Sequence, residues 1–532
     1  MSIDGYMTSP EWATLEPVEV LGRPVAVWRR RPRSVTELMA LGVRRDEDDF
    51  LVQGERRFTH GAFRRAVAAG AGALAAAGVQ PGDRVLIVLY NAPEFWLVQC
   101  AAWALGAVPV LGNRWWSPHA LARAIARIGP ALVATDLPVE APAARLTPDG
   151  IAGWWRLPAP ARPLPVPAVD EDDVAVIVFT AGSTGEPKSV QLSHRALVWS
   201  QQTAHVLRGG RPLLPPAAGA QKVALATTPL FHNGGMVATL GNQLDGGRIV
   251  FLSGRFDPAE ALRLIEAERV TSWSAVPTMF QRLLRHPDRP ARDLSSLIAP
   301  ASGGAAVSAE FVAEVTAALP HAARGFSSGY GMTEMSFVTL VGASDLAARP
   351  GTVGRVLPGV ELRIEAPPGG EGELLARSAA LMIGYLDGPE RPIDADGWYA
   401  TGDIGRMDAD GFVFITGRAK DMVIRGGENI SCQHVEDALL AHADVLEAAV
   451  IGVPDAEFGE AVAAVLHPRP GTTPDPAAIA AGLRARLAYF EVPTRWLLRA
   501  APLPVLPTGK IDKPALRREF SDHVNAREAE ER

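Results

Sequence analysis

The sixteen residues VAVIVFTAGSTGEPKS, positions 174–189, place an apolar run directly before a polar loop that is rich in glycine and hydroxyl side chains. The run 174–179 is apolar throughout, which is typical of a strand buried in a parallel sheet with helices on its faces. The loop that follows ends on Lys188 and offers N–H and O–H donors that can surround phosphate oxygens. The stretch therefore predicts an α/β fold with a candidate anion-binding loop at the end of one strand.

The spacing of this loop approaches that of a Walker A phosphate loop, because Gly182 precedes Lys188 and Ser189 by the required interval. Pro187 occupies the position of the second glycine. Proline fixes φ and lacks the N–H that a helix-opening phosphate loop directs at its ligand, so we exclude a P-loop NTPase. Taken alone, the loop is as compatible with an ordinary turn as with a phosphate site.

Helices alternate with short apolar strands on both sides of the loop, which predicts a parallel sheet covered by helices. We expect helices at 58–78, 93–105, 258–268 and 309–319, and strands at 85–89, 108–111, 223–228, 249–252 and 272–276. We expect a smaller α+β unit to begin near Arg418, with helices at 435–442 and 476–487 and a strand at 448–453. Eight prolines between 137 and 170 predict a surface segment without regular structure.

The composition narrows the class of protein. A chain of 532 residues exceeds the size of a single hydrophobic core, so we expect at least two domains. With 48% apolar and 21% charged residues and a net charge of −7, the chain is neither disordered nor a cationic nucleic-acid binder. Cys100 and Cys432 are too isolated for a disulfide framework, and the apolar stretch 97–112 is too short to span a bilayer. We expect a cytoplasmic protein that is neither secreted nor integral to a membrane.

Lysine is scarce, since only five of the 52 basic residues are lysine. Lysine provides a compact point charge on a flexible stem, whereas arginine provides a broad planar fork. Three lysines lie within candidate functional segments, namely Lys188, Lys420 and Lys510. We assign no role to Lys222 or Lys513.

The loop 180–189 resembles the signature T-S-G-[ST]-T-G-x-P-K-G of the adenylate-forming superfamily, with Ala181 and Ser189 as departures from it. Further segments similar to those of this superfamily follow in its order. They are PLFHNGG at 229–235, ASGGAA at 301–306, YGMTE at 330–334, GWYATGD at 397–403, GRAKDMVIRGGENI at 417–430 and LPTGKIDK at 506–513. The resemblance covers roughly residues 50–520, and on it the chain is identified as similar to the acyl-CoA synthetase branch.

The resemblance implies a large N-terminal AMP-binding domain, 1–417, built of stacked sheets covered by helices. It also implies a small mobile α+β C-terminal domain, 418–520, that follows a hinge at Lys420, with a charged tail at 521–532.

The resemblance also implies the roles of particular residues. ATP or AMP would contact Thr180, Ala181, Gly182, Ser183, Thr184, Gly185, Lys188, Ser302, Gly303, Gly304, Ala305, Tyr330, Gly331, Met332, Asp403 and Arg418. His232, Asn233 and Gly234 would line the acyl pocket, and Gly426 and Gly427 would contact CoA. Lys510, Glu334 and Thr333 would be catalytic, with Glu334 and Thr184 holding Mg²⁺.

Each of these side chains also has an ordinary structural interpretation. Glu334 could be a solvated acid that closes a turn, and Asp403 could cap a turn. Arg418 could form a surface ion pair, His232 could be a satisfied core histidine, and Lys510 could be an exposed turn lysine.

The reaction implied by the resemblance joins a carboxylic acid, which we expect to be a fatty acid, to CoA. The acid reacts with MgATP to give acyl-AMP and pyrophosphate, and the CoA thiol then displaces AMP. FHNGG lacks the acid that would pair with an amino-acid ammonium, and 403–418 has no room for the insertion typical of fatty acyl-AMP ligases. The alternatives are such a ligase acting on a free carrier protein, a luciferase-like oxidative enzyme, and a non-catalytic member of the fold. The oligomeric state stays open, with a homodimer as one option.

Overall fold

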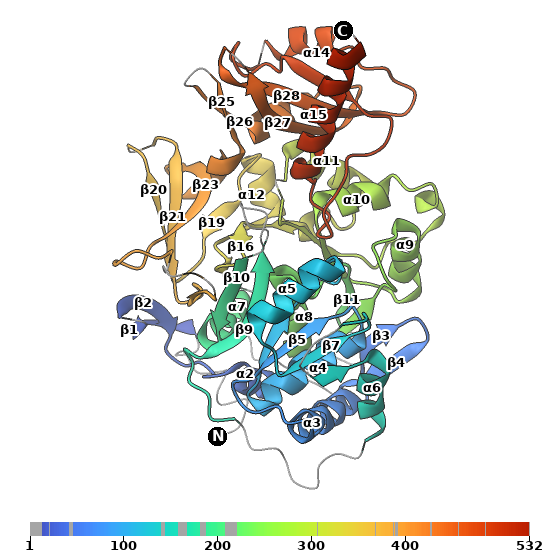
Figure 1. Cartoon of the computed structure of the whole chain (residues 1–532), viewed down its shortest axis with the longest axis vertical. Coiled ribbons are helices and arrows are strands. Elements are labelled where there is room, and N and C mark those ends of the chain that lie inside the picture. Colours follow the sequence, from blue (N-terminus) through green and yellow to red (C-terminus); the bar gives the residue numbers. More distant parts are fainter. Residues whose placement is uncertain are drawn as a thin grey trace.

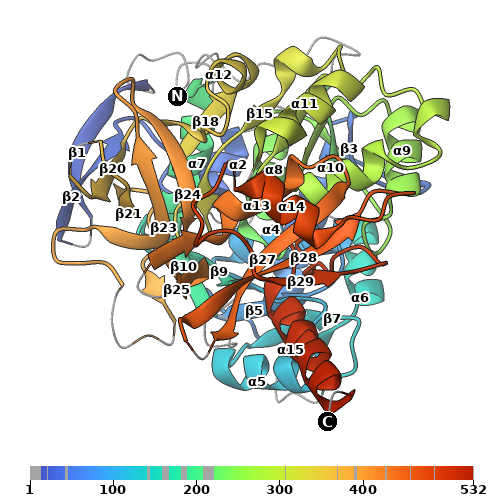
Figure 2. The same ribbon diagram turned by 90° about the horizontal axis from the view of Figure 1, so that it is seen from above.

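The computed structural model describes residues 13–20, 22–41, 46–139, 144–157, 167–180, 188–207, 221–305, 307–367, 369–386, 388, 392–425, 428–455, 457–484 and 486–530. A large unit holds the N-terminal three quarters of the chain, and a smaller unit lies above it (Figure 1). The view from above shows the smaller unit placed over the large one (Figure 2). The architecture is α/β, as predicted from the alternating pattern.

The loop-bearing strand lies in a seven-stranded sheet. In spatial order its strands are β22 (Gly384–Tyr385), β10 (Lys188–Ser193), β9 (Val174–Thr180), β6 (Val108–Leu111), β5 (Arg84–Val88), β7 (Leu132–Thr135) and β8 (Ala144–Leu146). The pairs from β9 to β8 are parallel, whereas β10 runs antiparallel to both of its neighbours. The strand predicted at 174–179 is therefore confirmed, and it ends where the candidate loop begins.

The second sheet of the large unit has thirteen strands. In spatial order they are β20 (Val360–Glu365), β21 (Gly372–Ser378), β23 (Tyr399–Met407), β24 (Phe412–Arg418), β19 (Gly354–Val356), β18 (Thr339–Gly342), β15 (Ser327–Ser328), β14 (Ala299–Ser302), β13 (Ser272–Ala275), β11 (Val223–Ala226), β12 (Arg248–Phe251), β3 (Asp49–Gln53) and β4 (Arg56–Thr59). The strands from β15 to β3 are parallel, and those at both ends of the sheet are antiparallel.

The smaller unit contains a third sheet, which consists of β26 (Glu428–Ser431), β25 (Met422–Arg425), β28 (Gly459–Pro468), β27 (Val445–Asp455) and β29 (Arg495–Leu498). Its strand β27 packs against α13 (Cys432–Leu440) and α15 (Lys513–Glu530), and α14 (Pro476–Leu483) packs against α13. β24 ends at Arg418 in the second sheet and β25 starts at Met422 in the third. The short helix η5 (Ala419–Asp421) is thus the link between the two units.

Helices of the large unit cover both of its sheets. They are α2 (Val35–Leu41), α3 (His60–Ala76), α4 (Pro93–Leu105), α5 (Pro118–Ile128), α7 (His194–Leu207), α8 (Asn233–Leu244), α9 (Pro258–Ala267), α10 (Pro277–Leu284), α11 (Ala309–Ala318) and α12 (Ala343–Ala348). Helix α4 is buried over its first eleven residues, which explains why its sequence is apolar on every face. It starts at Pro93 and stops at Gly106, whose left-handed φ of 82° favours glycine.

The prediction for the proline-rich segment was partly wrong. Within 137–170 the structure contains β8 and a short helix α6 (Pro148–Gly153), which continues into η2 (Trp154–Arg156). Pro148 stands at the first position of α6, where a missing N–H costs nothing, and Thr147 caps the helix by accepting from the N–H of Gly150. Trp154 is buried against α3, so this segment belongs to the core.

The contact between α3 and Trp154 predicts how two glycine substitutions in α3 change the stability of the protein. A Cβ built at Gly70 of α3 would stand 2.4 Å from the Trp154 ring, whereas one built at Gly72 meets nothing within 4 Å. Gly70→Ala should lower the free energy of unfolding by about 1–3 kcal/mol through overpacking. Gly72→Ala should raise it by up to about 1 kcal/mol, because alanine is the better helix former.

Urea unfolding of the two variants, followed by circular dichroism, measures both changes against the unmodified chain. Equal destabilisation by the two substitutions would contradict the packing of Trp154 on α3.

Candidate active site

Four neighbouring parallel strands, β11, β13, β14 and β15, end at the same edge of the second sheet. Ligands of open α/β sheets bind at the carboxyl ends of such strands. The predicted segments follow these ends directly: 229–235 follows β11, 302–305 follows β14 and 330–334 follows β15. The topology therefore gathers segments that are far apart in the sequence.

The turn after β14 is shaped like a cradle for a flat or anionic group. Gly304 adopts a left-handed φ of 75°, and no atom lies within 3.4 Å of a Cβ built at Gly303 or Gly304. Ser302 is only 3% exposed, and its Oγ has no hydrogen-bond partner within the described residues. A buried hydroxyl without a partner is costly unless a ligand supplies one, so Ser302 to Ala305 fit the nucleotide expected there.

The segment 330–334 forms a tight hairpin that presents two oxygen-bearing side chains. β16 (Gly331–Met332) pairs with β17 (Ser336–Phe337), so Thr333 and Glu334 lie at the turn. A Cβ at Gly331 would stand 1.8 Å from the Ser336 carbonyl oxygen, which explains the glycine. The Glu334 carbonyl oxygen accepts from the Met382 N–H at 2.7 Å, and this bond fixes the turn.

Asp403 is held by two partners. The Tyr330 hydroxyl donates to its Oδ2 at 2.6 Å, and Arg418 Nε donates to its Oδ1 at 2.6 Å. Asp403 is 2% exposed, whereas Arg418 is exposed. Because one partner is buried, the pair differs from a surface salt bridge between two exposed side chains. Burial and the negative charge of Asp403 raise the pKa of Tyr330 well above its ordinary value, which keeps the hydroxyl a donor. Two ionised carboxylate oxygens accept about four hydrogen bonds, so capacity for ribose hydroxyls remains.

Thr180 and Lys188 face each other across the β9–β10 pair at the two ends of the candidate phosphate loop. Lys188 Nζ lies 4.6 Å from the centroid of the Tyr385 ring. The five residues of the loop to which we assigned phosphate contacts, Ala181, Gly182, Ser183, Thr184 and Gly185, lie outside the described residues.

Lys510 reaches the large unit from a loop of the smaller one, drawn in red in Figure 1. Its Cε lies 3.7 Å from the Cβ position of Gly304, and the preceding Gly509 carbonyl accepts from the Thr278 hydroxyl of α10. Lys510 is nevertheless exposed to solvent. Crowding by protein atoms and, secondly, the positive charge of Arg418 lower the pKa of Lys510 to about 8, while Asp403 opposes this.

The expected acyl residues lie at the start of α8. His232 precedes the helix, Asn233 is buried and Gly234 is exposed. Desolvation and the nearby charge of Lys510 lower the pKa of His232 to about 4, so this ring is uncharged at neutral pH. Asn233 Nδ2 donates to Ser336 Oγ at 3.0 Å, while its buried Oδ1 has no partner in the described part of the chain.

The structure gives little information on three other predicted residues. Lys420 lies in η5, and nothing is described of its side chain, whereas Gly426 and Gly427 fall outside the described residues. Lys513 has a structural role that we did not predict, because its Nζ forms a 2.7 Å ion pair with Glu436.

Tyr385 and Tyr399 are site residues that the sequence reasoning missed. The Tyr385 hydroxyl donates to Glu334 Oε1 at 2.9 Å and lies 3.2 Å from the Tyr399 hydroxyl. The chain has only six tyrosines, and three of them, including Tyr330, lie in this site. That scarcity, like the scarcity of lysine, is a signal that could have identified them.

Glu334 and Thr333 provide hard oxygen donors that fit Mg²⁺. Within the described ranges no three His, Cys, Asp or Glu side chains are grouped as a metal site. Mg²⁺ is commonly bound by one or two carboxylates together with substrate phosphates, so a single carboxylate is consistent with an ion that arrives with the nucleotide.

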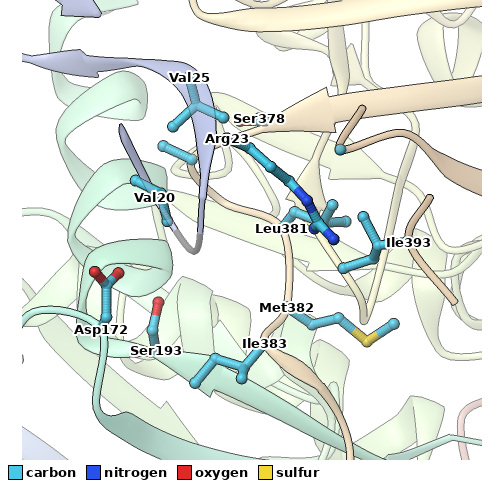
Figure 3. A pocket seen from close by; sticks show the side chains of 12 residues that line it. Val20, Arg23, Val25, Asp172, Ser193, Ser378, Leu381, Met382, Ile383 and Ile393 are labelled. Carbon is cyan, nitrogen blue, oxygen red and sulfur yellow. The ribbon is translucent and has the colours of Figure 1, made fainter. Parts of the chain in front are cut away.

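A small pocket lies between the N-terminal hairpin β1 (Leu15–Val20) and β2 (Arg23–Trp28) and the segment 378–383 (Figure 3). Arg23, Asp172, Ser193 and Ser378 are among its lining residues, and none of the predicted site residues lines it. It is therefore distinct from the surroundings of Lys510. Among the described residues no helix is both long and apolar enough to cross a bilayer.

Comparison with known proteins agrees with this arrangement. Residues 42–386 match the family model described as AMP-binding enzyme, and residues 434–510 match that of the AMP-binding enzyme C-terminal domain. The chain is 35% identical over 487 residues to a feruloyl-CoA synthase of an Amycolatopsis species, covering 88% of this chain and 95% of that protein.

Two further proteins extend the comparison. A long-chain-fatty-acid–CoA ligase of Bacillus subtilis is 34% identical over 371 residues, which cover 68% of this chain and 64% of that protein. The ATP-bound crystal structure of MatB from Rhodopseudomonas palustris superposes with a TM-score of 0.81 at 29% identity, covering 92% of this chain and 99% of that one.

The surroundings of Lys510 predict an unusual titration. Its ammonium should lose its proton near pH 8, whereas a lysine in water does so near 10.5. With only five lysines, ¹³C-dimethylation and NMR can follow each side chain separately. The signal that titrates near pH 8 should disappear in Lys510→Arg. If every lysine signal titrates at 10 or above, Lys510 does not occupy this cleft in solution.

Proposed function

The chain belongs to the AMP-binding enzymes of the adenylate-forming superfamily, in the acyl-CoA synthetase branch, and from this we propose the roles of its residues. It is an ATP-dependent acyl-CoA ligase, which joins an acid to a thiol. The observation that carries the proposal is the position of Lys510, next to the Ser302–Ala305 turn and to the Asp403–Arg418 pair. A lysine in this position could stabilise the negative charge that develops when the acid is adenylated.

In the first half-reaction, a carboxylate oxygen of the acid forms a bond to the α-phosphorus of ATP, and the bond to the pyrophosphate oxygen breaks. Lys510 would stabilise the negative charge that gathers around the α-phosphorus. Lys188 and the loop 180–185 would hold the phosphates, and Asp403 with Arg418 would hold the ribose. Ser302 to Ala305 and Tyr330 to Met332 would surround the adenine.

Mg²⁺ would be held by Glu334, with Thr333 beside it and Thr184 as a further ligand. When bound, the ion would neutralise part of the phosphate charge. Tyr385 donates to one oxygen of Glu334, and Tyr399 interacts with the same carboxylate, so the two tyrosines would orient it for the ion.

In the second half-reaction, the thiol sulfur of CoA forms a bond to the acyl carbon, and AMP leaves. We place the domain hinge at Lys420, because η5 joins the second sheet to the third. Rotation about it would withdraw Lys510 and bring Gly426 and Gly427 to the thiol. The proposed domains are 1–417 and 418–520, with 521–532 as a tail.

CoA is favoured over a carrier protein by the chain between Asp403 and Arg418. β23 and β24 are adjacent antiparallel strands, joined only by the turn at 408–411. The insertion expected of a fatty acyl-AMP ligase is absent at this place. Release of light or uptake of oxygen with a suitable acid would instead favour the luciferase-like alternative.

We further propose that the acid has an uncharged, apolar body, with fatty acids as the narrower expectation. The acyl segment 231–235 carries no acid, and its His232 is uncharged near neutral pH because its pKa is lowered to about 4. The two relatives named above act, by their names, on an aromatic acid and on long-chain fatty acids. Both kinds of acid fit this description.

Release of AMP with a panel of acids tests this proposal. The panel contains straight-chain acids from two to eighteen carbons, cinnamic-type aromatic acids, a dicarboxylic acid and an amino acid. Turnover should require ATP, CoA and an acid whose body, apart from the reacting carboxylate, is uncharged. Preference for the dicarboxylic or the amino acid would overturn the proposed substrate class, and pyrophosphate exchange without any acid-dependent CoA product would overturn the ligase assignment for this acid panel.

Removal of the Lys510 ammonium should separate the two half-reactions. Lys510→Ala should slow acid-dependent ATP–pyrophosphate exchange by about 10²–10³-fold, because one preorganised charge contact is lost. The variant should still convert supplied acyl-AMP and CoA to acyl-CoA. Lys510→Arg, the matched cationic control, should recover little exchange, because a planar fork replaces a point charge. Equal losses in both half-reactions would instead assign Lys510 to folding or general binding.

A further inference from the structure

We propose that Tyr385 is a positioning residue. The face of its ring fixes Lys188, the proposed phosphate-binding lysine, and its hydroxyl fixes Glu334, the proposed metal-binding carboxylate. The inference rests on the proposed roles of those two residues. Tyr385 contacts both of them, although they come from different sheets and from distant parts of the sequence.

The backbone of Tyr385 is tied to the strand that carries Lys188. β22 pairs with β10 in register Val190 to Tyr385, and the Leu386 N–H donates to the Ser189 carbonyl at 2.9 Å. Lys188 is the first residue of β10. Any displacement of this lysine's strand therefore carries Tyr385 with it.

The face of the Tyr385 ring receives the lysine. Lys188 Nζ lies 4.6 Å from the ring centroid, within the range in which the ring quadrupole attracts a cation. This contact uses only the ring face. The ammonium keeps its hydrogen-bond donors for a phosphate.

The hydroxyl of the same ring receives the carboxylate. It donates to Glu334 Oε1 at 2.9 Å, and the Tyr399 hydroxyl lies 3.2 Å from it. A hydrogen bond to a charged acceptor is stronger than one between neutral groups. Glu334 is also fixed through its backbone, because its carbonyl accepts from Met382, three residues before Tyr385.

These contacts give Tyr385 two separable functions. The hydroxyl orients Glu334, and the ring orients Lys188, so that one side chain contacts both a cation and an anion. Tyr385→Phe removes the first function alone. Tyr385→Leu removes both.

The test measures how Mg²⁺ promotes binding of α,β-methylene-ATP, by calorimetry of the full chain, and compares it with ATP–pyrophosphate exchange. Tyr385→Phe should raise the Mg²⁺ concentration that half-saturates both measurements by about tenfold, the loss expected for one hydrogen bond to a charged group. Its exchange rate at saturating Mg²⁺ should stay within about twofold of the unmodified enzyme. Tyr385→Leu should in addition weaken binding of the analogue without Mg²⁺ by about two- to fivefold.

Tyr90→Phe is the matched control, because the Tyr90 ring also receives a cation, Arg114 Cζ at 4.7 Å, and packs against Trp115 at a different place in the large unit. It should leave the Mg²⁺ dependence unchanged. Thermal unfolding of each variant identifies a general loss of structure, and a shift in Mg²⁺ dependence that Tyr90→Phe shares would overturn the inference.

Glu334→Gln distinguishes failure of this inference from failure of the proposed function. If Glu334→Gln raises the Mg²⁺ requirement and Tyr385→Phe does not, Tyr385 does not position the carboxylate, and the metal role of Glu334 stands. If neither variant changes the Mg²⁺ requirement, both the metal role of Glu334 and the role of Tyr385 are overturned. A raised requirement in both, with no further rise in the double variant, supports the proposal.

Discussion

The buried carboxylate of Asp403 is the constraint on which the site depends. An ionised group that is 2% exposed is tolerable only when it is paired and hydrogen-bonded, and here Tyr330 and Arg418 meet that need. Tyr330 begins the loop that carries Glu334, and Arg418 is the last residue before the link to the smaller unit. One desolvated charge therefore fixes the start of the 330–334 hairpin, the end of β24 and the point from which the smaller unit departs.

The contacts between the two units depend on the point at which the smaller unit departs from β24. The smaller unit places the loop of Gly509 and Lys510 against Thr278 and Gly304, which lie just beyond the ends of β13 and β14. The cleft is assembled from ends of strands, which the sheet holds rigidly, and from one loop of the other unit. Negative charge that develops at one atom is stabilised best by groups held in fixed positions. The rigid strand ends and the single ammonium of Lys510 meet this requirement.

The local part of the fold could be predicted from the sequence, and the long-range part could not. The strands β5, β6 and β9 could be recognised from their continuous apolar runs, because each is buried on both faces, whereas in β11 only alternate residues are buried. The antiparallel half of the second sheet depends on pairings such as β19 with β24, and no periodicity encodes which distant strands meet. The same limit explains the site: the resemblance located Lys510, Glu334 and Asp403, whereas Tyr385 became significant only when β22 paired with β10. The helix at Pro148 was missed because prolines were weighed as breakers and not as first residues of a helix.

Because the pKa of Lys510 is lowered, the preferred position of the smaller unit should depend on pH. In the cleft the pKa is about 8, and in water it is 10.5, so a conformation that returns this lysine to solvent takes up a proton when the pH lies between these values. Under the proposed hinge rotation, closure without nucleotide would release that proton and would be favoured as the pH rises. Bound phosphates act in the opposite direction, because their negative charge raises the pKa of a nearby ammonium. If the nucleotide binds as proposed, its phosphates would therefore oppose the loss of this proton on closure, and Lys510 would be a cation when the substrate is bound.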